Sequence, residues 1–477
     1  MNKLCFVLTV IVLTATACKP IQVIRQDKVL PLPGSVVGDS LSQTDSLGFG
    51  GRSWRLFFTD PNLQQLIDTA LYGSYDLQIA SRQIQQNEAY VLAARAPFLP
   101  EADLVASSSL RRFGLYTMDG AGNATTDIIS GKLVPINLPD YFGGIQASWE
   151  IDLWGKLRSQ KKAAVARFLA SVEGKNLVQT RLVALVAEVY FKLQALDAQT
   201  QILDEYITLQ QNALTLVQVQ KQAGMADELA VKQFENQLMD LQGTRIDLDQ
   251  QIREHENLIN VLLGRFPQPV SRSPLFLQQT LPEVDISSVP PQILENRPDI
   301  RAASLELSAS KADLDAARAM FYPSLNLGAA LGTQAFRPDL LLTQPQSLAY
   351  TLAGGLAAPI VNRRALKANF MQADAYQYEA LASYHQAIVG AYTEVYNYLF
   401  FMNNLRRQYE LKTKQTTAIN LAVDISGDLF RSGRANYLDV LTAQQNALET
   451  RLELVDLRLR QWANAVGLYR SLGGGWQ

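Results

Sequence analysis

The chain contains an internal repeat, and this repeat narrows the folds that it can adopt. The segment AARAPFLP at 93–100 returns as AARAMFYP at 316–323, which is 223 residues later (316 − 93). Further along, Gly224 matches Gly433 at a spacing of 209 residues (433 − 224). Copies of about 200 residues are far longer than the 20–50-residue unit of a solenoid. The repeat therefore predicts a duplicated module with internal pseudo-symmetry.

The shorter spacing also pairs Gly264 with Gly473, so the match continues almost to the C-terminus. We place the first repeat at 61–266, a linker at 267–290 and the second repeat at 291–477. The shorter spacing also means that one connecting loop is longer in the first copy.

The N-terminus predicts an export signal. Lys3 is followed by a short apolar run and by small residues directly before Cys18, which is the pattern of a signal peptide at 1–17. Small residues before a cysteine resemble the lipobox of bacterial lipoproteins. We therefore expect Cys18 to carry a lipid and 18–60 to form the lipid anchor and an extended segment. Ordinary signal cleavage near Ala17 is the alternative.

Composition argues against several functional classes. The only other cysteine, Cys5, lies in the signal, so the mature chain would have no disulfide. The net charge of −2, without runs of like charge, predicts no nucleic-acid partner. His255 and His385 lack metal-ligand spacing, and no phosphate-binding or nucleophile motif is present. We predict no catalysis, no cofactor and no metal.

Four short segments predict two strand hairpins, one in each copy, and they lie at 102–112, 145–152, 324–334 and 350–361. Apolar residues alternate with polar or small ones, as at Leu325, Leu327 and Leu331. Such a sheet suits a wall between lipid and water, although a half-buried sheet in a soluble domain has the same pattern. No stretch after the signal is apolar enough for a spanning helix, so a chain that crosses a membrane would need a closed β-barrel.

The remainder predicts long helices. The segment 155–222 contains no proline, and a second long helix is expected at about 363–431. Apolar residues repeat in steps of three and four, as at Leu193 and Leu452, which predicts coiled-coil seams. Gly224 and Gly433 would each end a long helix, and a returning helix would follow. Each copy therefore combines a strand hairpin with a long helical hairpin.

A single chain cannot close such a barrel. Four strands enclose no lumen, and an open sheet in lipid leaves unpaired edges. Several protomers must pool their strands, and the helical hairpins would then surround a continuous duct.

The chain resembles the TolC-type outer-membrane factors of Gram-negative efflux pumps, and in particular their lipoprotein branch. The resemblance rests on the strand pairs between long helices and on three motifs, RPDIR at 297–301, WEIDLWG at 149–155 and LGGGW at 472–476. It implies a mainly α fold with a small transmembrane β part. It also implies a homotrimer with a 12-stranded β-barrel in the outer membrane, continuous with a periplasmic coiled-coil α-barrel.

The resemblance also implies partners and a function. These are a periplasmic adaptor and an inner-membrane transporter, often of the resistance-nodulation-division type. The trimer would passively conduct small molecules to the exterior. A type I protein-secretion outlet is the closest alternative, followed by a periplasmic adaptor or a structural coiled-coil lipoprotein.

In relatives, acidic side chains ring the lumen just beyond the turn of the second hairpin. The matching residue is Asp439, and Phe430 occupies the aromatic tip position. A solvated carboxylate in the first turn of a helix is the alternative for Asp439. Four nearby charges are candidates for ties that hold the tip shut, or else for a solvated face: Asp424, Asp428, Arg431 and Arg434.

Overall fold

The computed structural model describes residues 53–282, 296–361 and 363–476. These belong to the second of the two units into which the chain divides, Gly34–Gln477. The signal peptide, Cys18 and the later part of the linker lie outside the described residues.

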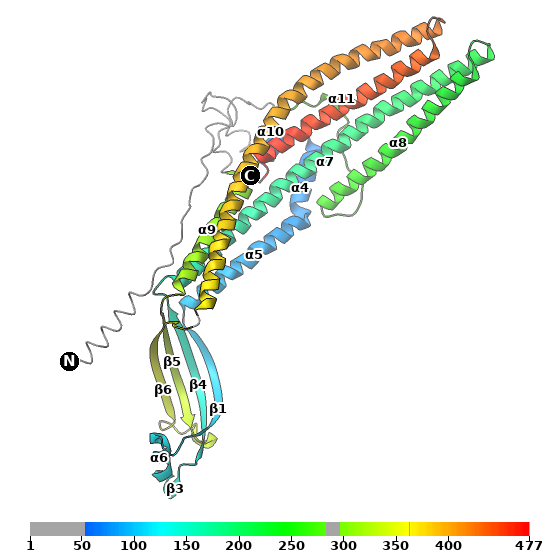
Figure 1. Ribbon diagram of the computed structural model, residues 1–477. Coiled ribbons are helices and arrows are strands. Elements are labelled where there is room, and N and C mark those ends of the chain that lie inside the picture. Colours follow the sequence, from blue (N-terminus) through cyan, green and yellow to red (C-terminus); the bar gives the residue numbers. More distant parts are fainter. Residues whose placement is uncertain (1–52, 283–295, 362, 477) are drawn as a thin grey trace, which may run out of the picture. The chain divides into compact units, whose positions relative to one another are not determined.

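Both copies share one order of main elements, namely a helix, two strands, a long helix and a returning helix, and the first copy has additional short elements (Figure 1). The first comprises α3 (Trp54–Phe57), α4 (Pro61–Gly73), α5 (Tyr75–Arg95), η1 (Ala96–Phe98), β1 (Glu101–Arg112), α6 (Met118–Thr125), β2 (Asp127–Ile129), β3 (Lys132–Leu133), β4 (Asn137–Ile151), α7 (Lys156–Gln222) and α8 (Glu228–Leu262). The linker contains η2 (Phe276–Gln278), and the second copy comprises α9 (Pro298–Ala319), β5 (Ser324–Ala335), η4 (Pro338–Leu340), β6 (Leu348–Ala357), α10 (Arg364–Arg431) and α11 (Tyr437–Ser471). The predicted fold class, with one strand hairpin and one long helical hairpin in each copy, is confirmed.

The two strand hairpins combine into one antiparallel sheet with the order β1-β4-β5-β6. The prediction for β4 was too short, because β4 begins at Asn137 and not at 145. From Asn137 to Asp140 it pairs only with β1, since pairing with β5 starts at Tyr141. Pro139, which has no backbone N–H, is tolerated in this edge-like part. β6 ends at Ala357, four residues before the predicted end.

The main core, the largest cluster of buried apolar residues, is built around α7. This helix packs against α4, α5, α8, α9 and α11. Leu193 is fully buried, and Phe191 stacks on Trp462 of α11 with ring centroids 4.2 Å apart. The predicted seam is buried along most of α7, whereas Leu438 at the start of α11 is 54% exposed in the single chain.

Candidate functional site

The turns of the two helical hairpins have the same geometry. Gly224 and Gly433 have φ of 73° and 71°, in the left-handed region that glycine adopts without a Cβ clash. The N–H after each glycine bonds a carbonyl five residues back, Met225 N to Gln220 O and Arg434 N to Leu429 O, both at 2.8 Å. This is the Schellman arrangement, which ends a helix while satisfying its last carbonyls.

The returning helices are capped differently in the two copies. Asp227 accepts a bond from Ala230 N (2.8 Å) and caps α8 alone. In α11, Asn436 and Asp439 form a capping box, in which Asp439 Oδ2 accepts from Asn436 N at 3.0 Å. Asp439 is exposed, whereas Ala230, its equivalent at the 209-residue spacing, is fully buried. The second turn alone therefore presents a carboxylate at this position.

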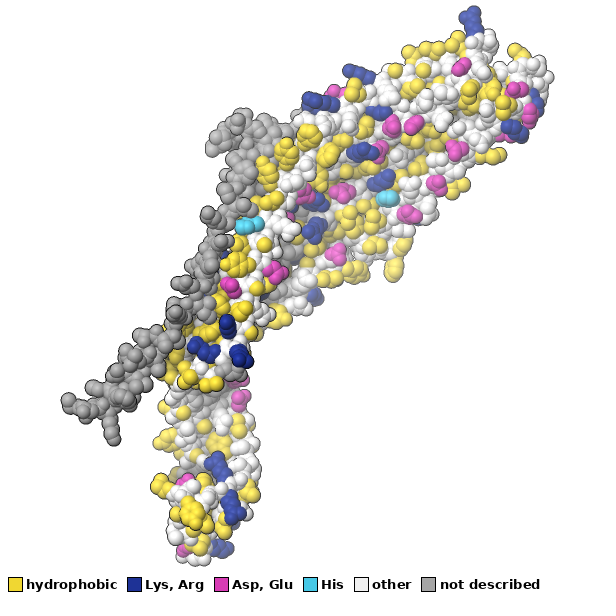
Figure 2. Space-filling model, viewed as in Figure 1, with side chains coloured by type: hydrophobic (Ala, Val, Ile, Leu, Met, Phe, Trp, Pro, Cys, Tyr) yellow, Lys and Arg dark blue, Asp and Glu magenta, His cyan; other side chains and the backbone are white. Residues whose placement is uncertain are grey.

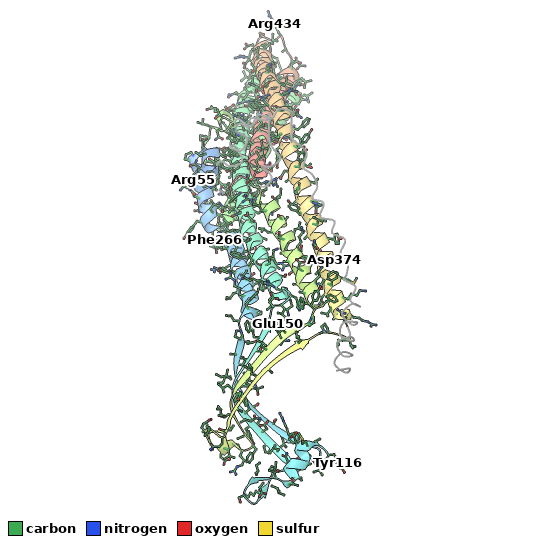
Figure 3. The ribbon with its side chains drawn as sticks, turned by 90° about the vertical axis from the view of Figure 1, so that its left-hand side faces the viewer. Arg55, Tyr116, Glu150, Phe266, Asp374 and Arg434 are labelled. Atoms are coloured by element: carbon green, nitrogen blue, oxygen red, sulfur yellow. The ribbon has the colours of Figure 1, made fainter. Side chains whose placement is uncertain are left out.

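The other charged candidates also lie at the second turn. Asp428 pairs with Arg431 within α10, one turn further along the same helix, so in the single chain this ion pair does not join two helices. Asp424 and Arg434 are exposed and have no ion-pair partner within the described part of the chain. Figure 3 labels Arg434 at the end of the molecule opposite to Tyr116, which follows β1.

Phe430 is half-buried and joins the two hairpins. A small cluster of Val217, Ala230, Val231 and Phe234, here called the tip cluster, fills the space between α7 and α8. Phe430, Tyr437 and Leu441 of the second hairpin pack against it. The two turns are therefore linked by a small apolar contact.

The sheet has two chemically different faces. The register places Leu104, Ile145, Leu331 and Tyr350 in one row across the four strands, and side chains two residues away share their face. The apolar residues of that face are Ala102, Leu104, Ala106, Leu110, Ile145, Ala147, Trp149, Leu325, Leu327, Ala329, Leu331, Tyr350, Leu352 and Leu356. Most residues of the opposite face are polar or small, including Glu101, Asp103, Ser107, Ser109, Gln146, Ser148, Glu150, Asn326, Gln334 and Thr351. Leu104 and Leu352 are 88% and 84% exposed, so the chain leaves the apolar face uncovered.

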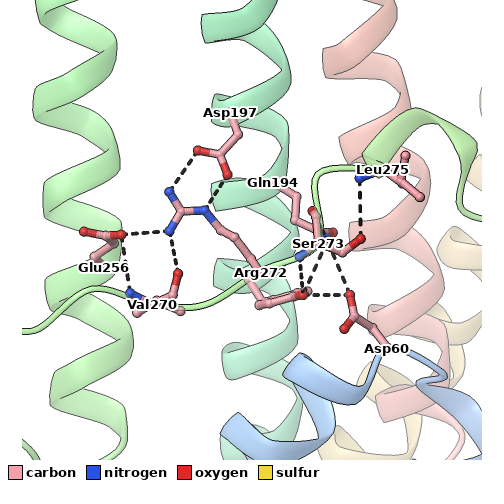
Figure 4. Close-up of polar contacts among 9 residues, drawn as sticks. Asp60, Gln194, Asp197, Glu256, Val270, Arg272, Ser273 and Leu275 are labelled. Carbon is pink, nitrogen blue, oxygen red and sulfur yellow. Dashed lines mark hydrogen bonds and ion pairs between the residues drawn. The ribbon is translucent and has the colours of Figure 1, made fainter.

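A buried polar network fixes the start of the linker (Figure 4). Arg272 bonds Asp197 of α7 (Nη2 to Oδ1, 2.8 Å) and Glu256 of α8 (Nη1 to Oε1, 2.7 Å). The hydrogen bond to Asp197, with help from Glu256, raises the pKa of Arg272 above its ordinary value. The N-terminal end of α4 joins through Asp60, which accepts from the Tyr190 hydroxyl of α7 at 2.7 Å. No sequence pattern predicts this network, because its members are far apart in the chain.

The three motifs behind the resemblance are joints between elements. Arg297 is held by Asp299 in a bidentate pair and donates to Glu394 of α10 (2.9 Å) and to the Ser471 carbonyl of α11 (2.9 Å). In the third motif, the Trp476 ring lies 5.6 Å from the guanidinium of Arg301. The motifs 297–301 and 472–476 thus meet in space.

The motif 149–155 joins the sheet to α7. Asp152 accepts bonds from the N–H groups of Leu157 and Arg158 and so caps this helix. Trp154 stacks on Tyr322 of the second copy with ring centroids 4.9 Å apart, and its indole N–H donates to the Pro323 carbonyl at 2.7 Å.

None of the described helices combines the length and apolarity that a transmembrane helix requires. Within the described ranges, no three His, Cys, Asp or Glu side chains gather as metal ligands would. His255 bonds the Gln251 carbonyl through Nδ1 at 2.8 Å, one turn back on its own helix.

An amphipathic four-stranded sheet joined to two long helical hairpins is the subunit architecture of TolC-type outer-membrane channels. The crystal structure of CusC, whose title refers to transmembrane channel formation, aligns over 95% of this chain and 100% of that chain, with a TM-score of 0.82 and 25% identity. The pyoverdine export outer membrane protein OpmQ of Pseudomonas putida is 31% identical over 425 residues, or 89% of this chain and 88% of that protein. The probable outer membrane lipoprotein SilC of Salmonella typhimurium is 27% identical over 423 residues, or 89% and 88%.

Residues 66–265 and 289–474 match the family described as outer membrane efflux protein. The chain belongs to this family. It is an outer-membrane efflux channel protein with a large periplasmic helical part. The predicted resemblance to TolC-type outer-membrane factors, the function as an efflux channel and the outer-membrane location are confirmed. Family members are channels and not enzymes in general. The roles of Cys18, Asp439 and the other tip residues stay predictions.

Proposed function

We propose that three copies of this chain form the outer-membrane duct of a tripartite efflux pump. The duct passively conducts small molecules from an inner-membrane transporter of the resistance-nodulation-division type, through a periplasmic adaptor, to the exterior. It performs no catalysis. The division into repeats at 61–266 and 291–477 belongs to the same proposal.

The observation that carries this proposal is the pair of open sheet edges. β1 and β6 form the two edges, and neither has a partner on its outer side within the described chain. With four antiparallel strands in each copy, β1 of one copy runs antiparallel to β6 of the next, so the ladder can continue. Three copies then give twelve strands, and closure removes the unpaired edges that lipid does not tolerate.

The helices support the same assembly. Along α10, Val395 and Leu399 are buried in the single chain, while Tyr396, Phe400 and Phe401 are 47%, 61% and 54% exposed. An exposed aromatic cluster of this kind on a long helix favours further helix packing between copies.

Disulfide trapping between the two edges tests the trimer. Cys5 and Cys18 are the only natural cysteines, so introduced pairs are easily followed. Ser107→Cys in β1 is combined in turn with Ala349→Cys, Thr351→Cys or Ala353→Cys in β6, all on the polar face. At least one pair is expected to give covalent trimers on oxidation.

The control replaces the β1 cysteine with Gln146→Cys in β4, an inner strand that no neighbouring copy reaches. This control should remain monomeric on a denaturing gel. A folded, monodisperse monomer in detergent, or equal crosslinking from β4, would refute the closed barrel.

We also propose that Asp439 lines the periplasmic constriction, with Asp424, Asp428, Phe430, Arg431 and Arg434 around the gate. Asp439 is exposed, and the pseudo-equivalent Ala230 carries no charge. A ring of carboxylates around an axis attracts cations. The tip cluster is small, so the two turns can separate at little cost.

Cys18 is proposed as the lipid attachment site. Support comes from the small residues before it and from the similarity to SilC, which is named as a probable lipoprotein. In cells fed a labelled fatty acid, the wild-type protein should carry label and the Cys18→Ser variant should not. Persisting label in Cys18→Ser would place the lipid elsewhere.

A further inference from the structure

Cations without ion-pair partners gather where the helices meet the sheet. β1 follows η1 at the end of α5, and α7 begins five residues after β4 ends. In the second copy, β5 follows α9 and α10 follows β6. A group of Lys and Arg side chains lies on the helices just beside the strands (Figure 2). The whole-chain charge of −2 conceals this local basic surface.

In the first copy the cations line an apolar groove. This groove, of about 470 Å³, lies between η1, α7 and α9 and is lined by Phe98, Arg158, Lys161, Lys162, Val165, Ala166, Leu169 and Leu305. Lys161 Nζ lies 5.5 Å from the centre of the Phe98 ring. Arg158 is paired with Asp152, at 3.1 Å. Lys161 and Lys162 have no carboxylate partner among the described residues.

The second copy repeats the arrangement. Phe321 is the repeat equivalent of Phe98, and the Arg363 guanidinium lies 5.3 Å from its ring centre. Arg363 Nε is buried without a hydrogen-bond partner among the described residues. Arg364 and Lys367 follow on the first turn of α10 and form no ion pair in the described chain. The same aromatic–cation pairing thus occurs twice, although the surrounding sequences differ.

The unpaired cations at the start of α10 oppose the local helix dipole. The N-terminal end of a helix carries partial positive charge and favours acids. At the hairpin turns, α8 and α11 follow this rule with Glu228 and Asp439 in their first turns. In α7 the first-turn cations Lys156 and Arg158 are paired with Glu150 and Asp152, and Lys161 and Lys162 follow in the next turn. In α10 the first turn has no acid and carries Arg364 and Lys367. Helix stability therefore does not explain Arg364 and Lys367, whereas a bound anion would.

The level of the groove matches the edge of the membrane. The stacked pair Trp154–Tyr322 lies at the same junction, and both rings are 52% exposed. Trp and Tyr concentrate at membrane–water interfaces. The apolar sheet face begins immediately beyond, and the helices are periplasmic. In the proposed assembly the groove is therefore at the level of the headgroup layer on the periplasmic side.

We propose that this groove binds an anionic phospholipid. Its phosphate lies between Lys161 and Lys162, and an acyl chain lies along Phe98, Leu169 and Leu305. Arg363, Arg364 and Lys367 bind a second headgroup of the same class on the other copy. Charge complementarity and continuity with the membrane-facing sheet select a lipid as the occupant, and the inference rests on the outer-membrane location of the chain.

Native mass spectrometry of the purified full-length protein tests the proposal, because it reads assembly and bound lipid in one spectrum. The protein in detergent is titrated with dimyristoyl phosphatidylglycerol or with the neutral dimyristoyl phosphatidylcholine. Wild type should prefer phosphatidylglycerol. The variant Lys161→Gln/Lys162→Gln should weaken that binding roughly 10- to 30-fold, since each basic residue near a lipid surface contributes about a factor of five. Lys161→Arg/Lys162→Arg should retain it.

The matched control is Arg406→Gln/Arg407→Gln, which removes two exposed charges from α10 far from the junction. This control should bind lipid as wild type does. Leu169→Asn should weaken lipid binding, because an acyl chain is expected to contact Leu169. Any binding of inorganic phosphate alone should stay unchanged in this variant. Arg364→Gln/Lys367→Gln should reduce the number of lipids bound.

Three results would overturn the proposal. Equal loss in the Arg406/Arg407 control would reveal only a general charge effect. Undiminished phosphatidylglycerol binding in Lys161→Gln/Lys162→Gln would show that another copy covers these lysines or that the lipid binds elsewhere. Displacement of the lipid by millimolar inorganic phosphate would identify a phosphate site in place of a lipid site.

Discussion

The main core and the hairpin turns are built from the same helices but are held in different ways. Around Leu193 and Trp462, helices of both copies pack together, and aromatic rings stack across them. At the turns, the tip cluster has four buried residues, and only three apolar side chains of the second hairpin contact it. Side-chain packing therefore decreases from the main core towards the turns.

Ion pairs differ in the same direction. Arg297 beside the main core has a side chain 11% exposed and joins α9, α10 and α11. At the turn, Arg431 and Asp428 are 67% and 71% exposed and belong to one helix. The region around the main core is thus held by buried links between elements, while the turn of the second hairpin has local and solvated ones.

The largest expected effect comes from breaking the buried ion pairs. Arg297→Met leaves Asp299 without its partner and removes one of the two cations that pair with Glu394, the other being Arg470. It should lower the free energy of unfolding by about 3–5 kcal/mol. Arg431→Met at the turn should cost about 1 kcal/mol or less. Chemical unfolding followed by circular dichroism measures both. Similar losses in the two variants would contradict the difference between the regions.

Apolar truncation should give the next largest contrast. Leu193 is fully buried, with 0% of its surface exposed in the single chain. Leu193→Ala should therefore lower the free energy of unfolding by about 2–5 kcal/mol. Leu441 is only half-buried against the tip cluster, and Leu441→Ala should cost clearly less. If both variants unfold at the same denaturant concentration, the turns are as tightly packed as the core.

Acid should weaken the main core through Asp299. Burial opposes ionisation of Asp299, but the hydrogen bonds and charge of Arg297 outweigh it and hold the pKa of Asp299 below its ordinary value of 3.8. A lowered carboxyl pKa contributes stability that is present above the unfolded-state pKa and is lost as pH falls through the folded-state pKa. Asp299→Asn should therefore be less stable than wild type at pH 7, and this difference should shrink below about pH 4. A constant difference from pH 7 to pH 3 would remove Asp299 from the acid response.

Much of this fold could be predicted from the sequence. The long helices begin and end within one residue of the predicted 155–222 and 363–431, because proline-free periodic segments and turn glycines mark them. The start of β4 was missed, since a strand tolerates Pro139 only where β5 no longer pairs with it, and the sequence does not show where β5 stops.

The contacts that fix the core could not be predicted in this way. Arg297 and Glu394, or Arg272 and Asp197, are far apart in the chain, and a single sequence holds no signal that they meet. The same holds for the apolar groove, because the strand hairpin separates Phe98 from Lys161 in the chain. Local geometry at Gly224 and Gly433, by contrast, needs no distant partner.

The smallest effect on stability, and the most specific effect on function, is expected at Asp439. Asp439→Asn removes the charge but keeps an oxygen that can accept from Asn436 N, so the free energy of unfolding should change by about 1 kcal/mol or less. If three copies of Asp439 line the constriction, trimers of the variant in planar bilayers should lose part of their cation preference and of their block by divalent cations. Asp227→Asn serves as the control, because it removes a cap charge at the first turn without touching the position of Asp439. Asp227 matches Asn436 in the repeat, and the match of Asp439 is the buried Ala230. Unchanged selectivity in Asp439→Asn, or an equal change in Asp227→Asn, would limit Asp439 to its capping box and leave the constriction to other residues between 424 and 442.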